Sequence, residues 1–283
     1  MEPKIQHTRL YVLAGLFSAL LLVYLGILFN TQVLDHEAYL AKSVHSIAKE
    51  ETVSASRGII TDRSGRTLVS NTSAYDLTFD TSLLKEGEDT NQAILRILAL
   101  CQQEEKTWVD NLPIRQQAPY TYTLEQASDA QRSRFLTYLK SLDGAKKALG
   151  LYLLSHPELV PEEEQPAADP ADATQTPEKR GAALLDRFPA SALTAEVLSG
   201  AGLSAATLMS MMAEEVELPA GLTAEQRRQV LGVRYELALR RNNGYTDYVL
   251  AEDIDTEFIS LIADGRYAGA KVTTSTKREY ETT

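Results

Sequence analysis

Few residues in this chain of 283 could do chemistry by their type and spacing. Its histidines could ligate a metal, but they show no clustering of the kind that metal ligands have: His7, His36, His45 and His156. The carboxylates at 162–172 lack the spacing of an EF-hand calcium loop. Ser-x-x-Lys occurs at 46–49 and at 82–85, and a pattern with two free positions arises by chance. We therefore predict no metal, no cofactor and no catalytic residue.

The single cysteine, Cys101, excludes an intrachain disulfide, so stability must come from packing. It lies in an apolar helical pattern, which is typical of a buried small side chain rather than a reactive thiol. The formal net charge is −11 and the isoelectric point is about 5.0. Such a chain offers no basic face to neutralise phosphates, which argues against nucleic acid as a partner.

The elements that carry these residues begin with an apolar stretch at 10–29, which contains no charge and no proline. At 1.5 Å per residue such a helix is about 30 Å long and would cross a bilayer as a single transmembrane helix. Lys4 and Arg9 precede it, and Asp35 and Glu37 follow it. Because positive residues stay inside, we expect a cytoplasmic N-terminus at 1–9 and the bulk of the chain outside the cell membrane. A cleaved signal peptide is the alternative, and it predicts a mature N-terminus near residue 30.

Beyond this stretch, residues 30–50 contain neither glycine nor proline and repeat apolar residues at helical spacing, which predicts a stalk helix. The pattern changes after Glu51. Two β-prone runs, Ile59–Thr61 and Thr67–Val69, flank a loop with a glycine, which predicts a β-hairpin. A third strand is expected over Tyr75–Phe79, where apolar and polar residues alternate.

The hairpin carries the motif Arg-Gly-x-Ile-x-Asp-Arg-x-Gly-x-x-Leu, followed by an asparagine. In this position the motif resembles the start of the non-catalytic N-terminal module of class B penicillin-binding proteins. The matching residues are Arg57, Gly58, Asp62, Arg63, Gly65, Leu68 and Asn71. Ser56 and Val69 stand where the family commonly has proline and alanine. The charged residues of the motif could tie the hairpin to a neighbouring strand through charge-assisted hydrogen bonds.

A second part of the resemblance lies near the C-terminus. Arg234, Tyr235 and Glu236, followed by a strand, a short helix and a strand at 269–276, are similar to the closing segment of the same module. Helical patterns occupy 90–104, 124–142 and 181–218, and a Pro- and Glu-rich segment at 156–180 predicts a disordered acidic insertion. We therefore expect an α+β fold, in which residues 51–283 form an extracytoplasmic pedestal of β-hairpins and helices, also called the dimerisation module.

The resemblance implies a membrane-anchored module that positions a peptidoglycan D,D-transpeptidase domain in cell wall synthesis. The family's active site uses Ser-x-x-Lys, Ser-x-Asn and Lys-Ser/Thr-Gly, and the last two are absent, so we expect no enzyme activity from this chain. The implied partners are a polytopic glycan polymerase, other elongation or division proteins and, indirectly, peptidoglycan. The alternative is a free-standing bitopic extracytoplasmic scaffold or sensor with no attached enzyme.

Overall fold

The computed structural model describes residues 7–29, 57–161, 176–241 and 244–281. The chain divides into two compact units, Met1–Ala55 and Ser56–Thr283. The first unit contains helix α1, His7–Phe29, whose described side chains are all exposed. Within the described residues, no helix combines the length and the apolar character needed to cross a membrane. The transmembrane span predicted at 10–29 is therefore not confirmed, and the stalk helix predicted at 30–50 lies outside the described residues.

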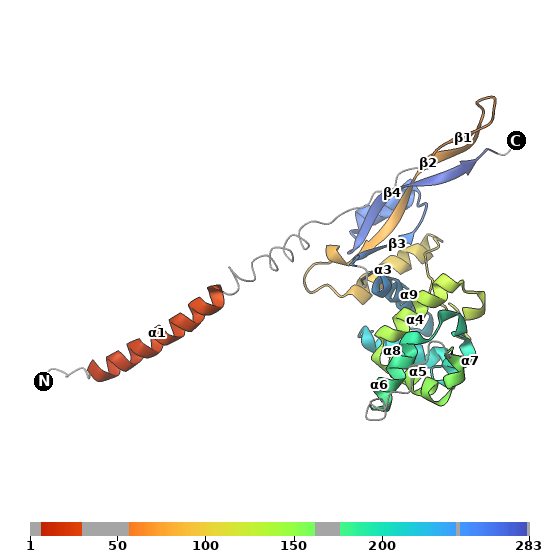
Figure 1. Cartoon of the computed structure of the whole chain (residues 1–283). Coiled ribbons are helices and arrows are strands. Elements are labelled where there is room, and N and C mark those ends of the chain that lie inside the picture. The colour runs from red at the N-terminus through yellow and green to blue at the C-terminus, as the bar shows by residue number, and fades with distance from the viewer. Residues whose placement is uncertain (1–6, 30–56, 162–175, 242–243, 282–283) are drawn as a thin grey trace. The chain divides into compact units, whose positions relative to one another are not determined.

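An antiparallel sheet organises the second unit (Figure 1). Its strands are β1 (Ile60–Thr61), β2 (Thr67–Asp80), β3 (Asp247–Ala251) and β4 (Ala270–Tyr280). β4 pairs with β2 without interruption from Val69 to Phe79, so β1 and β3 share the opposite edge of β2. The predicted hairpin is confirmed. The strand predicted at Tyr75–Phe79 is not separate but continues β2, because β4 supplies a partner along its whole length.

Three helices pack against the end of the sheet where β2 meets β3. They are α3 (Thr90–Gln103), α9 (Ala224–Arg241) and α10 (Thr256–Gly265). Side chains from these helices and from the strands form one cluster, which we call the sheet core: Leu77, Phe79, Ile94, Ile97, Cys101, Val230, Val233, Tyr248, Leu250 and Phe258. Aspartates cap two of the helices, since Asp89 accepts from the backbone of Asn91 and Asp255 from that of Phe258. The predicted helix at 90–104 is thus confirmed.

Five further helices form a second cluster within the described residues, the helical core. They are α4 (Asp129–Ser141), α5 (Asp143–Ser155), α6 (Pro177–Arg187), α7 (Ala195–Gly200) and α8 (Ala205–Glu215). Three 3-10 turns accompany them: Leu124–Gln126, Pro157–Leu159 and Ala190–Ala192. A further 3-10 turn, Thr81–Leu83, follows β2 beside the sheet. α5 and α6 approach closely, because a Cβ on Gly181 would lie 2.6 Å from the backbone of Gly150. α9 serves both clusters: Leu231 and Tyr235 belong to the helical core, and Val230 and Val233 to the sheet core.

The structure differs from two of the sequence-based predictions in this region. The helix expected at 124–142 begins only at Asp129, because Ser128 and Gln131 form a capping box there. The flexible insertion expected at 156–180 has ordered flanks, while 162–175 lies outside the described residues. Val160 is buried and Pro177 opens α6. Proline is compatible with the first position of a helix, so it marked helix starts here rather than disorder.

Candidate functional site

The motif residues near the N-terminus lie in what we call the hairpin head, which comprises residues 57–71 and 278–281. Asp62 organises its turn. Its Oδ1 accepts hydrogen bonds from the backbone N–H of Ser64 (2.7 Å) and of Arg66 (2.9 Å). Gly65 has a φ of +82°, which a residue with a Cβ adopts only at a cost. The carboxylate of Asp62 and the missing side chain of Gly65 therefore make the turn.

Two further motif residues fix the segment that leads into β1. The Asn71 side-chain amide donates to the backbone carbonyl of Arg57, which holds this segment beside β2. The guanidinium groups of Arg57 and Arg63 are exposed and make no ion pair within the described part of the chain. The charge-assisted tie expected from these arginines is therefore not formed there. Gly58 is exposed, and a Cβ added to it would meet nothing within 4 Å.

The hairpin head also exposes large apolar side chains. Ile59 is 64% exposed, Ile60 48% and Tyr280 67%, and Leu68 of the motif is 38% exposed. Ile60 and Tyr280 both pair with Val69, one from each edge of β2, so their side chains share one face of the sheet. Exposed arginines beside exposed aliphatic and aromatic side chains are typical of a protein–protein contact surface.

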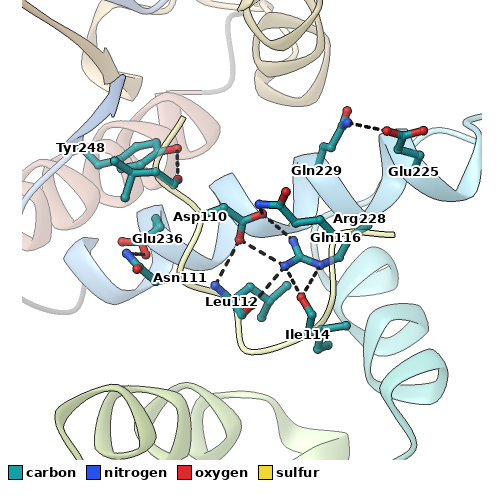
Figure 2. Close-up of polar contacts among 11 residues, drawn as sticks. Asp110, Asn111, Leu112, Ile114, Gln116, Glu225, Arg228, Gln229, Glu236 and Tyr248 are labelled. Carbon is teal, nitrogen blue, oxygen red and sulfur yellow. Dashed lines mark hydrogen bonds and ion pairs between the residues drawn. The ribbon is translucent and has the colours of Figure 1, made fainter. Parts of the chain in front are cut away.

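The second set of motif residues lies on α9, where the two cores meet. We call this region the α9 junction. At its centre Arg228 forms a bidentate pair with Asp110, with Nη1–Oδ2 at 2.8 Å and Nη2–Oδ1 at 3.3 Å (Figure 2). Both side chains are only 1% exposed. The same guanidinium donates to the backbone carbonyls of Leu112 (3.1 Å) and Ile114 (2.6 Å). Arg228 therefore fastens the 110–114 segment to α9.

A glycine makes this approach possible. A Cβ on Gly232, one turn after Arg228, would lie 2.7 Å from the Asp110 carboxylate. Burial raises the pKa of the Asp110 carboxyl, while the Arg228 guanidinium acts in the opposite direction. Each guanidinium nitrogen of Arg228 and each carboxylate oxygen of Asp110 has a hydrogen-bond partner, and removing one residue would leave an uncompensated buried charge.

The three predicted residues of α9 each bind a different neighbour. Arg234 donates through Nε to Asn91 Oδ1 at 2.8 Å, and the Asn91 amide donates to the Val216 carbonyl at 2.9 Å. Tyr235 is buried and packs edge-on against two rings of the helical core, those of Phe135 and Tyr138.

Glu236, the third, is buried and accepts from Asn111 Nδ2 at 2.8 Å, and it also pairs with Arg240 (Figure 2 shows the first contact). The contacts of Arg234, Tyr235 and Glu236 join α9 to α3, to α4 and to the 110–114 segment. Burial lowers the pKa of the Arg234 guanidinium. The two motif sets are not brought together, since one lies at the free end of the sheet and the other beneath its opposite end (Figure 1).

Neither region has the arrangement of a catalytic site. Ser82 Oγ donates to Asp80 Oδ1 at 2.6 Å, so this hydroxyl is bound to the carboxylate that caps the 3-10 turn Thr81–Leu83. Ser46, in the other Ser-x-x-Lys pattern, lies outside the described residues. Within the described ranges no three metal-ligating side chains come together. What these residues can do is hold backbone segments together and, in the head, present a surface.

Sequence reasoning missed the Arg228–Asp110 pair. A signal was present, because Arg228 precedes Leu231 by three residues and Tyr235 by seven and so falls on the apolar stripe of its helix. A charged residue on that stripe needs a buried partner. Nothing local in the sequence indicated that the partner would be Asp110, more than a hundred residues earlier.

Comparisons with known proteins bear on both regions. The family model described as "Penicillin-binding Protein dimerisation domain" matches residues 52–283. Among solved structures, penicillin-binding protein 2B from Streptococcus pneumoniae (strain 5204) is similar, with 15% identity and a TM-score of 0.31. That match covers 82% of this chain and 27% of the other, so this chain spans about a quarter of the length of that protein. The search of curated proteins found no match.

Proposed function

The chain belongs to the penicillin-binding protein dimerisation-domain family, and on this premise we propose that it is the membrane-anchored, non-catalytic module of a class B penicillin-binding protein. In this proposal it positions a peptidoglycan D,D-transpeptidase domain for cell wall synthesis. Residues 10–29 anchor it in the cell membrane as a single-pass helix with the N-terminus in the cytoplasm. The hairpin head contacts the domain that it positions.

The observation that carries the proposal is the pairing around Val69. The strand by which the chain enters the module, β1, and the strand by which it leaves, β4, pair with the same residue of β2 from opposite edges. At Val69, β1, β2 and β4 therefore lie side by side in one hydrogen-bonded sheet, and only β2 separates the first strand of the module from its last. A domain attached after β4 would be held at a fixed distance from the segment before β1.

The exposed side chains of the hairpin head support a contact at this exit. Ile59, Ile60 and Tyr280 are more exposed than any described apolar side chain of the two cores. Arg57 and Arg63 are exposed and have no ion-pair partner among the residues that the structure describes, so they could pair with carboxylates of a neighbour. We include as proposed partners a polytopic glycan polymerase and other elongation or division proteins.

Fractionation of cells that express the full chain tests the anchor. We expect the chain in the carbonate-resistant membrane fraction, and a variant lacking residues 1–29 in the soluble fraction. Because the proposal assigns the chain no nucleophile, labelled penicillin should not acylate it. Recovery of the full chain from the soluble fraction, or a covalent adduct on Ser46 or Ser82, would overturn the proposal.

A chimera tests the positioning role. A class B transpeptidase domain is joined after β4, and a flexible Gly/Ser spacer is inserted either after Tyr280 or, as the matched control, between Glu86 and Gly87 in an exposed loop outside the hairpin head. We expect the spacer after Tyr280 to reduce peptidoglycan cross-linking in cells, and the loop spacer to leave it unchanged. Equal cross-linking by both variants would contradict a rigid connection through β4.

A further inference from the structure

A pocket of about 320 Å³ opens at the surface where α8 lies beside the start of α9. It belongs to the second unit and contains none of the motif residues. Its lining side chains are mainly apolar, and Tyr120 and Arg227 add polar groups to them. This volume is at the lower end of the range for ligand pockets, so the pocket accommodates a single residue rather than a long segment.

The floor of the pocket is apolar and adaptable. Met209 is 5% exposed and belongs to the helical core, and Ala206 lies three residues earlier on the same face of α8. Leu222 and Ala224 add apolar surface where the chain enters α9. A methionine side chain is flexible and polarisable, so it packs against apolar groups of differing shape. The floor therefore favours an aliphatic or aromatic group without requiring one particular shape.

Arg227 is the charged residue among those that line the pocket. It is half-buried, and within the described part of the chain its guanidinium makes no ion pair and no hydrogen bond. The next residue, Arg228, differs in both respects, because it is buried and paired with Asp110. The guanidinium of Arg227 therefore offers a planar set of donors at the pocket to an anion from outside the chain.

A second donor lies in the same pocket. The ring of Tyr120 packs against the helical core, and its hydroxyl has no hydrogen-bond partner among the residues that the structure describes. A phenol can donate one hydrogen bond, and a guanidinium can donate two side by side to the two oxygens of a carboxylate. The polar groups of the pocket thus match a carboxylate.

The small size of the pocket restricts how the two chemistries can be combined. Because the apolar floor and the arginine share a space for one residue, the apolar group and the carboxylate must belong to the same residue. An apolar residue at the C-terminus of a chain has both groups. An internal aspartate or glutamate carries its carboxylate on the side chain and has no apolar group left for the floor.

We propose that this pocket binds the apolar C-terminal residue of a partner protein. The carboxylate of that residue pairs with Arg227 and Tyr120, and its side chain packs on Met209. This binding site goes beyond the positioning role proposed above and does not depend on it, since neither the anchor nor the hairpin head takes part.

Fluorescence anisotropy with the full chain in lipid nanodiscs tests the site. The probe is a fluorescein-labelled peptide, Gly-Ser-Gly-Leu, with a free C-terminal carboxylate. One control is the same peptide with a C-terminal amide, and the other ends in serine instead of leucine. We expect each control to bind about ten-fold more weakly or worse, because each lacks one of the two recognised groups. Equal binding of the acid and the amide, or no binding of the leucine acid, would overturn the proposal.

Substitutions assign the binding to this pocket. Arg227→Gln should abolish the preference for the acid over the amide. Arg180→Gln is the matched control and should retain that preference, because Arg180 is an exposed arginine of α6 that does not line the pocket. Thermal unfolding of both variants checks that they are folded. A preference that survives in Arg227→Gln would overturn the role of this arginine.

Filling the pocket provides a test that leaves the arginine in place. Ala206 is exposed, so Ala206→Trp should preserve the fold while its ring occupies the space above Met209. We expect this variant to lose binding of the leucine acid about ten-fold or more. Unchanged binding would place the peptide elsewhere on the chain. Failure in any of these measurements leaves the fractionation and chimera results unaffected, so it is distinguishable from failure of the proposed function.

Discussion

The hairpin head and the α9 junction both contain residues shared with the family motif, but the two regions use their charges in opposite ways. At the junction, the motif residues Tyr235 and Glu236 are 2% and 4% exposed, and the neighbouring Arg228–Asp110 pair is 1% exposed. In the head, Arg57 and Arg63 are exposed and have no ion-pair partner among the described residues. Matching a motif therefore does not fix a residue's role. Buried motif residues hold the module together, whereas exposed ones are available to another protein.

Removing one partner of the junction pair should have the largest effect on stability. Asp110→Ala leaves the Arg228 charge buried without a counter-ion, and we expect a loss of about 3–5 kcal/mol in the free energy of unfolding by urea titration. Glu178→Ala is the matched control, because its pair with Lys147 is more than half exposed and should contribute at most about 1 kcal/mol.

A double substitution, Asp110→Leu with Arg228→Met, removes both charges and should recover much of that loss. If Asp110→Ala and Glu178→Ala were equally mild, the buried pair of the junction would not hold the module together.

The pH dependence of stability tests whether water is excluded from the sheet core. Burial raises the pKa of the Cys101 thiol to about 11, from an ordinary value of 9.0. The unfolded chain therefore loses its thiol proton first. The contribution of the protonated Cys101 thiol to the free energy of unfolding is complete below about pH 9. It is lost as the pH rises towards 11, and the loss amounts to about 2–3 kcal/mol in total.

Cys101→Ala removes this contribution and leaves the buried tyrosines unchanged. The difference in unfolding free energy between wild type and this variant should therefore change over this alkaline range. A constant difference would show that the thiol titrates normally and that the sheet core admits water.

The two glycines of the motif in the hairpin head are expected to differ in importance, because Gly65 has a positive φ and Gly58 has open space around it. Gly65→Ala places a Cβ at φ +82° and should cost about 1–2 kcal/mol in thermal unfolding. Gly58→Ala, where the added Cβ meets nothing, should change stability by less than about 0.5 kcal/mol. Equal losses would mean that Gly58 also has a structural role.

The smallest stability effect is expected at the exposed apolar side chains of the head. Ile60→Ser combined with Tyr280→Ser should leave the unfolding free energy within about 0.5 kcal/mol of wild type for each position. The same variant should weaken the binding of whichever protein contacts the head, measured by pull-down of a transpeptidase domain supplied separately. A large loss of stability would show that these side chains, like the buried residues of the junction, help to hold the module together.

The sequence predicted the local features of the fold better than its long-range contacts. The hairpin, the glycine in its turn and the helix at 90–104 were readable because spacing and turn residues act within a few positions. The single long β2 was not, because it depends on β4, about 200 residues later. The Arg228–Asp110 pair was hidden for the same reason, and the prolines at 157 and 177 indicated disorder when taken only by composition.

α9 contributes side chains to both cores, and this sharing bears on how the module melts. If one core unfolded alone, the side chains that α9 contributes to that core would be exposed to solvent. We therefore expect the two cores to unfold together in one cooperative transition. The backbone amides in the middle of α9 should then exchange with solvent deuterium only when the whole second unit opens, which would make this helix the slowest-exchanging element of the protein.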